Sequence, residues 1–202
     1  MDDDGSKKPM LSYRFEDALV FATRLHAGQK RKSTKIPYIA HLLAVTSLVL
    51  EDGGGEDEAI AALLHDGVED QGGMKTLNEI RERFGDHVAD LVDALSDAYT
   101  KPKPPWRQRK QDYIAHLRQA SGEVRRISLA DKLHNARDIL RTLEEEGEAT
   151  WKRFRGGKAG TLWYYRSLAE VFQETGSNYM TEELVRVIGK IEELAGDVNR
   201  NL

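Results

Sequence analysis

The 202-residue sequence contains no cysteine, only five prolines and few aromatic residues. Without cysteine the chain cannot form disulfides, use a thiolate nucleophile or hold zinc or iron–sulfur centres through thiolates. Any metal must therefore be bound by nitrogen and oxygen ligands. No segment approaches the roughly 18 consecutive apolar residues of a membrane-spanning helix, and the acidic start Met1–Asp4 is unlike a secretory signal. We therefore expect a cytoplasmic protein that does not associate with membranes.

A strong charge of one sign is also missing. The formal net charge is −4, so the chain lacks the positive surface of a general nucleic-acid binder, and we expect no nucleic-acid partner. With 40% hydrophobic residues the chain can bury one compact core. We expect a disordered leader over residues 1–10 and a single domain over 11–202, with C-terminal helices from about residue 149. The oligomeric state is left open.

Apolar residues recur at helical spacing almost throughout, whereas the alternating β-branched runs of strands are hard to find. The pattern predicts an all-α fold. Closely spaced prolines exclude a helix at Lys101–Pro105, which we predict to be an exposed loop and a candidate lid. Thr76–Glu79 has the pattern of a capping box, and Gly85 suits the end of the helix it opens. Further helices are predicted over residues 13–26, 38–51, 57–68, 88–98, 107–119, 123–145, 161–174 and 182–199, with a loop over 27–36 and a break near Gly156 and Gly157.

Four ionisable residues stand at the end of the apolar helix predicted over 57–68. They are His65, Asp66, Glu69 and Asp70, and their three- and four-residue spacing places them on one helix surface. Three carboxylates there would repel one another, and a divalent cation would offset that repulsion. Taken alone, however, a solvated helix end is the commoner explanation of such a group.

Two further polar residues interrupt apolar helices elsewhere in the chain. His41 lies inside the helix predicted over 38–51, and Asp131 lies within the apolar run Ile127–Leu133. A hydrogen-bonded core histidine would explain the first, and pairing with Lys132 or Arg137 would explain the second. Together with His65 and Asp66, they complete a set of four metal ligands.

These residues match the order of the H…HD…D signature, so the chain resembles the HD-domain phosphohydrolases. The segments His26–Ser33, Pro37–His41, His65–Asp70 and Leu129–Asn135 are similar to the hydrolase domain of the Rel/SpoT alarmone enzymes and their stand-alone small relatives. The resemblance covers roughly residues 15–145 and implies an all-α HD-domain helical bundle. The chain has no room for the synthetase and regulatory domains of the larger enzymes, so we expect a hydrolase only.

The resemblance also implies a reaction. Water would attack the phosphorus on the ribose 3′ oxygen of guanosine tetra- or pentaphosphate, and pyrophosphate would leave. Glu69 and Asp70 would be the catalytic acid–base pair, one helical turn beyond the metal. The resemblance implies a divalent metal, manganese, held by His41, His65, Asp66 and Asp131.

Cationic and polar side chains are expected around such a substrate. By resemblance, Arg31 would stack on the purine, while Lys32 and Ser33 would contact the nucleotide; a solvated charged loop is the alternative. Asn135 matches a position near the nucleotide, and a hydrogen bond within its own helix is the other explanation. Lys110, with Arg109 and Tyr113, resembles a segment that faces the phosphates, and a purely structural role is equally favoured.

The C-terminal part is unlike the Rel/SpoT hydrolase domain. There, Lys158 and Tyr164 would help to close the pocket, whereas core packing is favoured for Trp163, Tyr165 and Phe172. The sequence also departs from the family where Thr34–Ile36 replaces a Gly-Glu pair and Leu42 replaces a proline.

Two other functions fit the same residues. One is an HD phosphatase acting on another nucleotide, such as a deoxynucleotide or a phosphorylated dinucleotide cofactor. The other is a non-catalytic nucleotide sensor, against which Glu69 and Asp70 argue because binding alone does not need them. A purely structural role ranks last, because it leaves the aligned ligands unexplained.

Overall fold

The computed structural model describes residues 10–32, 34–96 and 103–196. The regular structure in these ranges is helical, apart from one isolated antiparallel bridge between Lys30 and Pro37 that closes the predicted loop over 27–36. The predicted all-α fold is confirmed. None of the described helices is both long and apolar enough to cross a membrane. The helices are α1 (Tyr13–Leu25), α2 (Ile39–Glu51), α3 (Glu56–Leu64), α4 (Gly67–Gln71), α5 (Met74–Phe84), α6 (Asp86–Leu95), α7 (Trp106–Gln119), α8 (Gly122–Glu146), the 3₁₀ helix η1 (Gly147–Arg153), α9 (Gly157–Thr175) and α10 (Tyr179–Leu194).

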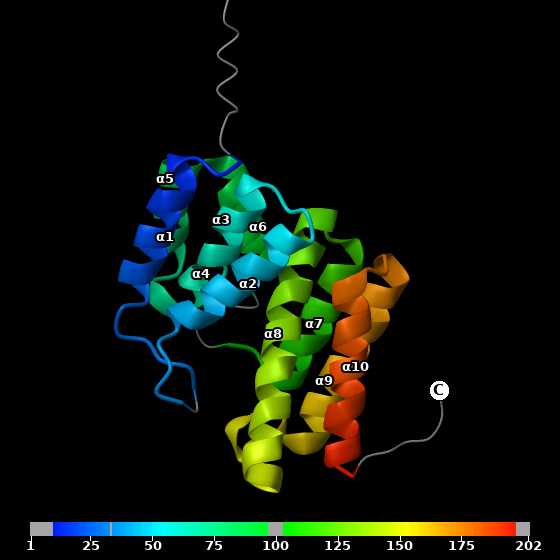
Figure 1. Ribbon diagram of the computed structural model, residues 1–202. Coiled ribbons are helices and arrows are strands. Elements are labelled where there is room, and N and C mark those ends of the chain that lie inside the picture. The colour runs from blue at the N-terminus through cyan, green and yellow to red at the C-terminus, as the bar shows by residue number, and fades with distance from the viewer. Residues whose placement is uncertain (1–9, 33, 97–102, 197–202) are drawn as a thin grey trace, which may run out of the picture.

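The long helix α8 runs through the centre of the molecule and connects its two halves (Figure 1). On one side α8 contacts α2, α3 and α6, and on the other it contacts α10, α9 and η1. Its N-terminus is fixed by the Ser121 side chain, which accepts a hydrogen bond from the Val124 amide at 3.2 Å. A polar residue on α8 can therefore meet residues from either half of the chain.

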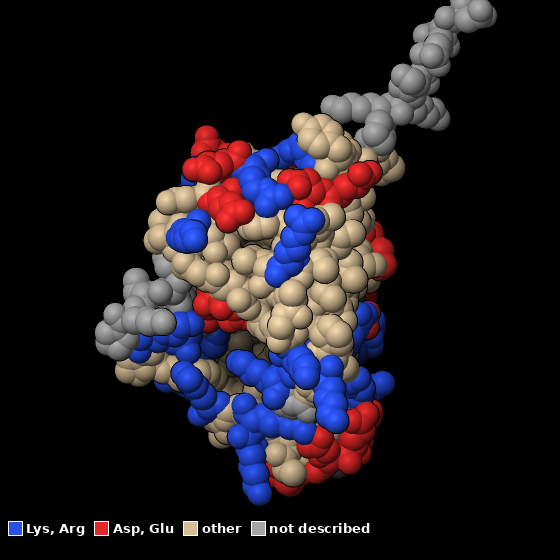
Figure 2. Space-filling model, turned by 90° about the vertical axis from the view of Figure 1, so that its left-hand side faces the viewer, with Lys and Arg blue, Asp and Glu red and all other residues tan. Residues whose placement is uncertain are grey.

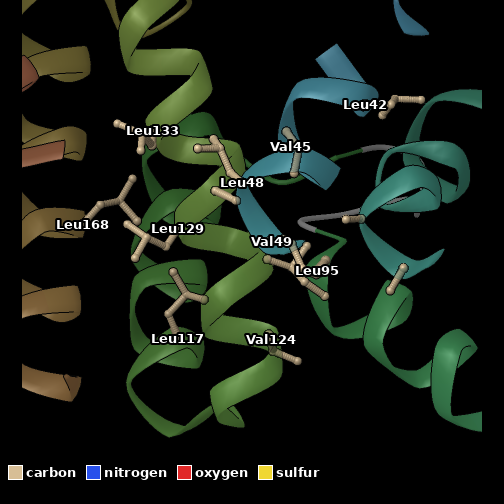
Figure 3. Close-up of a cluster of buried hydrophobic side chains, with 14 of the residues drawn as sticks. Leu42, Val45, Leu48, Val49, Leu95, Leu117, Val124, Leu129, Leu133 and Leu168 are labelled. Atoms are coloured by element: carbon tan, nitrogen blue, oxygen red, sulfur yellow. The ribbon is translucent and has the colours of Figure 1, made fainter. Parts of the chain in front are cut away.

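Apolar side chains from both halves pack along α8 (Figure 3). Leu42, Val45 and Val49 of α2 are fully buried, and Leu117 of α7 and Leu168 of α9 approach from the other side. Burying an aliphatic side chain of this kind contributes about 1.5–3 kcal/mol. This core holds α2, α3 and α8 in a fixed relation, which is the requirement for a site built from all three.

The prediction of one continuous helix over 57–68 is wrong, because the structure has two helices there. α3 ends at Leu64 and α4 begins at Gly67, so His65 and Asp66 form the junction. The Nδ1 of His65 bonds to the Ala62 carbonyl oxygen at 2.8 Å, an acceptor that a continuous helix would offer to the amide of residue 66. His65 and Asp66 therefore project from a turn, not from one regular helical face.

The capping box predicted at Thr76 is also wrong. Gly72 and Gly73 adopt φ of 150° and 61°, a turn that starts α5 at Met74, two residues before Thr76. The Thr76 hydroxyl instead donates to the Gln71 carbonyl oxygen at 3.2 Å. Gly85 ends α5 with φ of 94°, as predicted.

Most other helix bounds agree with prediction to within a few residues. The predicted break near Gly156 and Gly157 is also present, between the end of η1 at Arg153 and the start of α9. α9 starts at Gly157 rather than 161, and α10 starts at Tyr179 because the Asn178 side chain caps it at 3.0 Å. Residues 1–9 of the predicted leader, residues 97–102 and the end of the helix predicted over 182–199 lie outside the described residues. Of the predicted loop at 101–105, the described residues 103–105 are exposed.

A close contact between α7 and α9 provides a stability test. A methyl group on Gly156 would lie 2.5 Å from Cη2 of Trp106, whereas one on Gly122 would meet nothing within 4 Å. Gly156→Ala should therefore lower the free energy of unfolding by about 1–3 kcal/mol. Gly122→Ala, the matched control, should change it by less than about 1 kcal/mol. Urea denaturation measures both, and equal stability of the two variants would contradict this packing.

Candidate metal and catalytic site

The four predicted metal ligands converge beside α8. His41 comes from α2, His65 and Asp66 from the α3–α4 junction, and Asp131 from α8. His65 Nε2 lies 3.1 Å from Asp66 Oδ2, and His41 Nε2 lies 3.2 Å from Asp131 Oδ1. The cross distances, His41 to Asp66 and His65 to Asp131, are 3.6 and 3.7 Å. His41, His65 and Asp66 each offer a ligand atom within 4.8 Å of the others, so the group could hold a metal ion.

His65 is oriented for this purpose. Its Nδ1 lies 2.8 Å from the Ala62 carbonyl oxygen and must donate, so the neutral form of the ring, the form that binds a metal, has its lone pair on Nε2. The ring is 5% exposed, and Nε2 is buried with no hydrogen-bond partner. A buried acceptor without a partner is costly unless something binds it. A histidine ligand whose second nitrogen donates to a backbone carbonyl is the usual arrangement at metal centres.

His41, which is 1% exposed, is held in a comparable way. Its Nδ1 lies 2.8 Å from Nδ1 of His134. Burial, followed by the charges of His41 and Arg31, lowers the pKa of His134 to about 4, so its ring is neutral and can accept this bond. With Nδ1 as the donor, the neutral form of the His41 ring has its lone pair on Nε2, the atom that lies 3.2 Å from Asp131 and 3.6 Å from Asp66.

Each carboxylate of the cluster is fixed by a neighbour. The Tyr38 hydroxyl donates to Asp66 Oδ2 at 2.5 Å, and the Lys132 ammonium donates to Asp131 Oδ2 at 2.5 Å. Burial and the charge of Asp66 raise the pKa of Tyr38, so the phenol remains a donor. One alternative for Asp131 was an ion pair with Lys132, and that pair is present. It uses Oδ2 of Asp131, so Oδ1 still faces the two histidines.

The carboxylates of Asp66 and Asp131 favour a positive charge at the point where the four side chains meet. Burial acts to lower the pKa of His65, but the carboxylates of Asp66 and Asp131 outweigh it and raise that pKa well above its ordinary value. Burial acts to raise the pKa of Asp131, but the Lys132 charge and bonds from the histidines hold it well below its usual range. Burial also acts to raise the pKa of Asp66, but the charge of His65 and bonds from the histidines hold that pKa well below its usual range, so both carboxylates are ionised, as metal ligands must be.

Glu69 and Asp70 lie on α4, one turn beyond the cluster. Lys103 donates to Glu69 Oε1 at 2.6 Å, and Gln29 donates to Asp70 Oδ2 at 2.7 Å. Gln29 is itself held, because its Oε1 accepts from Gln71 and lies 2.7 Å from Nδ1 of His26. Burial and the charge of Asp66 raise the pKa of Asp70, whereas the Gln29 bond lowers it. A carboxylate of raised pKa beside a candidate metal site is suited to accept a proton.

A cavity of about 270 Å³ opens on the other side of His41. Arg31 lines it, with its guanidinium 2.8 Å from Asn135 Oδ1 and 3.3 Å from Asp138 Oδ2. Asn135 also donates to Asp131 Oδ1 at 2.5 Å, so the predicted bond within its own helix is present as well. Figure 2 shows Lys and Arg side chains gathered over this part of the surface, around a hollow with acidic side chains on its upper edge.

The other residues predicted to contact the substrate lie in different surroundings. Lys32 is exposed beside Arg31, and Ser33 lies outside the described residues. Lys110 lies 4.9 Å from the ring centre of Tyr164, which packs near Lys132. Lys158 is the exception, because its ammonium donates to Glu148 and to the Ala195 carbonyl oxygen, at the ends of η1 and α10. In the structure Lys158 therefore links η1 to the residue that follows α10, and its predicted part in closing the pocket stays a prediction. Tyr165 and Phe172 are buried and Trp163 packs against the core, as predicted.

Comparison with known proteins decides the family. An HD-domain family model matches residues 18–162, which is most of the chain. The chain belongs to the HD-domain family. This confirms the resemblance that the H…HD…D residues indicated.

Similar proteins of this family include two vertebrate enzymes named guanosine-3′,5′-bis(diphosphate) 3′-pyrophosphohydrolase MESH1. The Homo sapiens protein is 33% identical over 86% of this chain and 92% of its own length. The Xenopus tropicalis protein is 39% identical over 64% of this chain and 71% of its own. A solved structure of a metazoan ortholog of SpoT, described as hydrolysing ppGpp, aligns with a TM-score of 0.72 and 25% identity over 96% of this chain and 100% of that chain.

Several residues around the site had no role assigned from sequence. Tyr38, Gln29 and His26 lie within the segments that carry the family resemblance, and that was the available signal for them. Lys132 and His134 are polar residues next to Asp131, but helix periodicity alone does not show which of them turns toward the site.

The Gln29 bond makes a prediction about Asp70. Gln29→Leu should raise the pKa of Asp70 further, because it removes the hydrogen bond to the ionised form. Gln71→Leu is the control, since it keeps the Gln29–Asp70 bond. An NMR titration of the side-chain carboxyl carbons of Asp70 in the metal-free protein measures this directly. An unchanged Asp70 titration in Gln29→Leu would contradict the contact.

Proposed function

We propose that this chain is a divalent-metal-dependent pyrophosphohydrolase that removes the 3′ pyrophosphate of guanosine tetra- or pentaphosphate. The observation that carries the proposal is the buried, unpartnered Nε2 of His65, which lies within 3.1–3.7 Å of carboxylates from Asp66 and Asp131. The names of the MESH1 relatives support the substrate.

The residues present fit a metal. The donor set of two imidazoles, which bind a metal in their neutral form, and two carboxylates has no sulfur, and it suits manganese and other divalent ions that accept mixed nitrogen and oxygen ligands. The proposed ligands are His41, His65, Asp66 and Asp131. When bound, the metal would polarise a phosphoryl oxygen and lower the pKa of a water molecule. We propose manganese as the resident ion.

The chain's own acid–base groups would move the protons. Asp70, whose pKa is raised, would accept the proton of the attacking water, while Gln29 holds its Oδ2 in place. Glu69 would stand next to it as the second member of the pair, with its carboxylate oriented by Lys103. Both residues belong to α4, which begins directly after the proposed metal ligands His65 and Asp66. Their position relative to the metal is therefore fixed by that helix.

The substrate would lie across the cavity beside His41. Arg31, whose guanidinium donates to Asn135 and Asp138, would stack on the base, while Lys32 would contact the nucleotide. Asn135 links the Arg31 guanidinium to Asp131, so the base contact and the proposed metal site are joined through one side chain. Lys110 would face the phosphates of the substrate.

The experiment that tests the function is product identification. Purified protein, stripped of metal and reloaded with manganese, is incubated with guanosine tetraphosphate and followed by ³¹P NMR. The proposal predicts GDP and pyrophosphate in equal amounts. Orthophosphate released from other nucleotides, with no pyrophosphate from guanosine tetraphosphate, would assign an HD phosphatase of another substrate. Binding of the nucleotide without turnover would assign a sensor.

Two variants separate metal binding from catalysis. Asp70→Asn should keep the metal but lower kcat by about 100-fold or more, because an amide cannot accept the water's proton. Asp131→Asn should lose manganese affinity as well as turnover. Asp90→Asn, at an exposed position on α6, is the control for both. Metal content by mass spectrometry and kcat are measured together. Full turnover in Asp70→Asn, or full metal content in Asp131→Asn, would contradict the assignment.

A further inference from the structure

The cavity beside His41 is large enough for the base of a nucleotide. Its volume of about 270 Å³ is close to the lower end of the roughly 300–1,000 Å³ of small-molecule pockets. Ile36 and Ala40 provide an apolar wall, and Arg31 provides a planar guanidinium. An aromatic ring system with a polar edge is the kind of ligand that such a lining accepts.

The cavity also lies at a suitable distance from the proposed metal site. Asp131, Asn135 and Asp138 follow one another at four and three residues along one face of α8. At 1.5 Å per residue, Asp138 is about 10 Å along the helix axis from Asp131. A nucleotide with its 3′ phosphate beside Asp131 would therefore bring the far edge of its base to Asp138.

Asp138 differs chemically from the other side chains of the cavity. Arg31, Arg137 and Arg141 carry only hydrogen-bond donors. Nδ1 of His134 is occupied by His41. Among the described residues that line the cavity, Asp138 is thus the one side chain that can accept hydrogen bonds from a ligand there. It is held by Arg31 at Oδ2 and by Arg141 at Oδ1, and two of its roughly four lone-pair positions remain.

We propose that Asp138 is the specificity-determining residue for the base, and that it accepts hydrogen bonds from the N1–H and 2-amino groups of guanine. These adjacent donors match the two oxygens of a carboxylate. Hypoxanthine lacks the 2-amino group, and adenine has an acceptor at N1, which would face the carboxylate unfavourably. A site built to pair with specific donors discriminates strongly against a base that lacks them. The inference rests on the proposed function for the position of the nucleotide.

Base preference can be measured with and without turnover. Titration calorimetry with GDP, IDP and ADP reports binding alone, and hydrolysis of the 3′-pyrophosphate 5′-diphosphates of guanosine, inosine and adenosine reports kcat/KM. The wild-type protein should favour guanine over hypoxanthine by about tenfold and over adenine by more, in both assays. Asp138→Asn should reduce the guanine-to-adenine ratio by about tenfold or more, with a larger change in KM than in kcat and with full metal content.

Two controls keep the result specific. Arg141→Gln retains the carboxylate and should keep the base preference. If Asp138 served only to hold Arg31, then Asp138→Asn would weaken all three bases equally, and that result would overturn the proposal. Equal binding of the three bases by the wild-type protein would also overturn it, even if guanosine tetraphosphate is hydrolysed. A guanine preference in binding that depends on Asp138, without any pyrophosphate release, would instead support the base contact and refute the proposed function.

Discussion

Two imidazole nitrogens and two carboxylates meet at one point, and they come from α2, the α3–α4 junction and α8. His41 and His65 are almost fully buried, and the site's carboxylates stand within 3.7 Å of their Nε2 atoms. Burying ionised carboxylates costs several kcal/mol each unless partners compensate them. The apolar core brings α2, α3 and α8 together, and the buried polar groups are tolerated between them because they satisfy one another and their neighbours.

The neighbours of the cluster each fix a specific atom. The Ala62 carbonyl and His134 occupy the Nδ1 positions of His65 and His41, so the Nε2 positions are left for a ligand. Lys132 occupies the far oxygen of Asp131. Each neighbour thus bonds to one atom of a ligand and leaves another atom free to face the centre of the cluster. A buried polar cluster becomes a candidate metal site in this way, because a metal needs lone pairs that point to one place.

The sequence allowed the all-α fold and the four-residue cluster to be predicted, since His41 and Asp131 are polar interruptions of apolar helices and His65-Asp66 ends one. Features that depend on tertiary contact could not be predicted. The break at His65 arises from a side-chain bond to Ala62, and the shifted start of α5 arises from two glycines with positive φ. Lys158 was predicted to lie at the pocket, and its partners, Glu148 and the Ala195 carbonyl oxygen, are 10 and 37 residues away along the chain, so no local pattern indicates them.

We propose that His41, His65, Asp66 and Asp131 together hold a single divalent metal ion. The most direct measurement is anomalous diffraction from crystals of the manganese-loaded protein, recorded at the manganese edge. We expect one strong peak per chain, bounded by the Nε2 atoms of His41 and His65 and by carboxylate oxygens of Asp66 and Asp131. A peak at another position, or none at this cluster under saturating manganese, would contradict it.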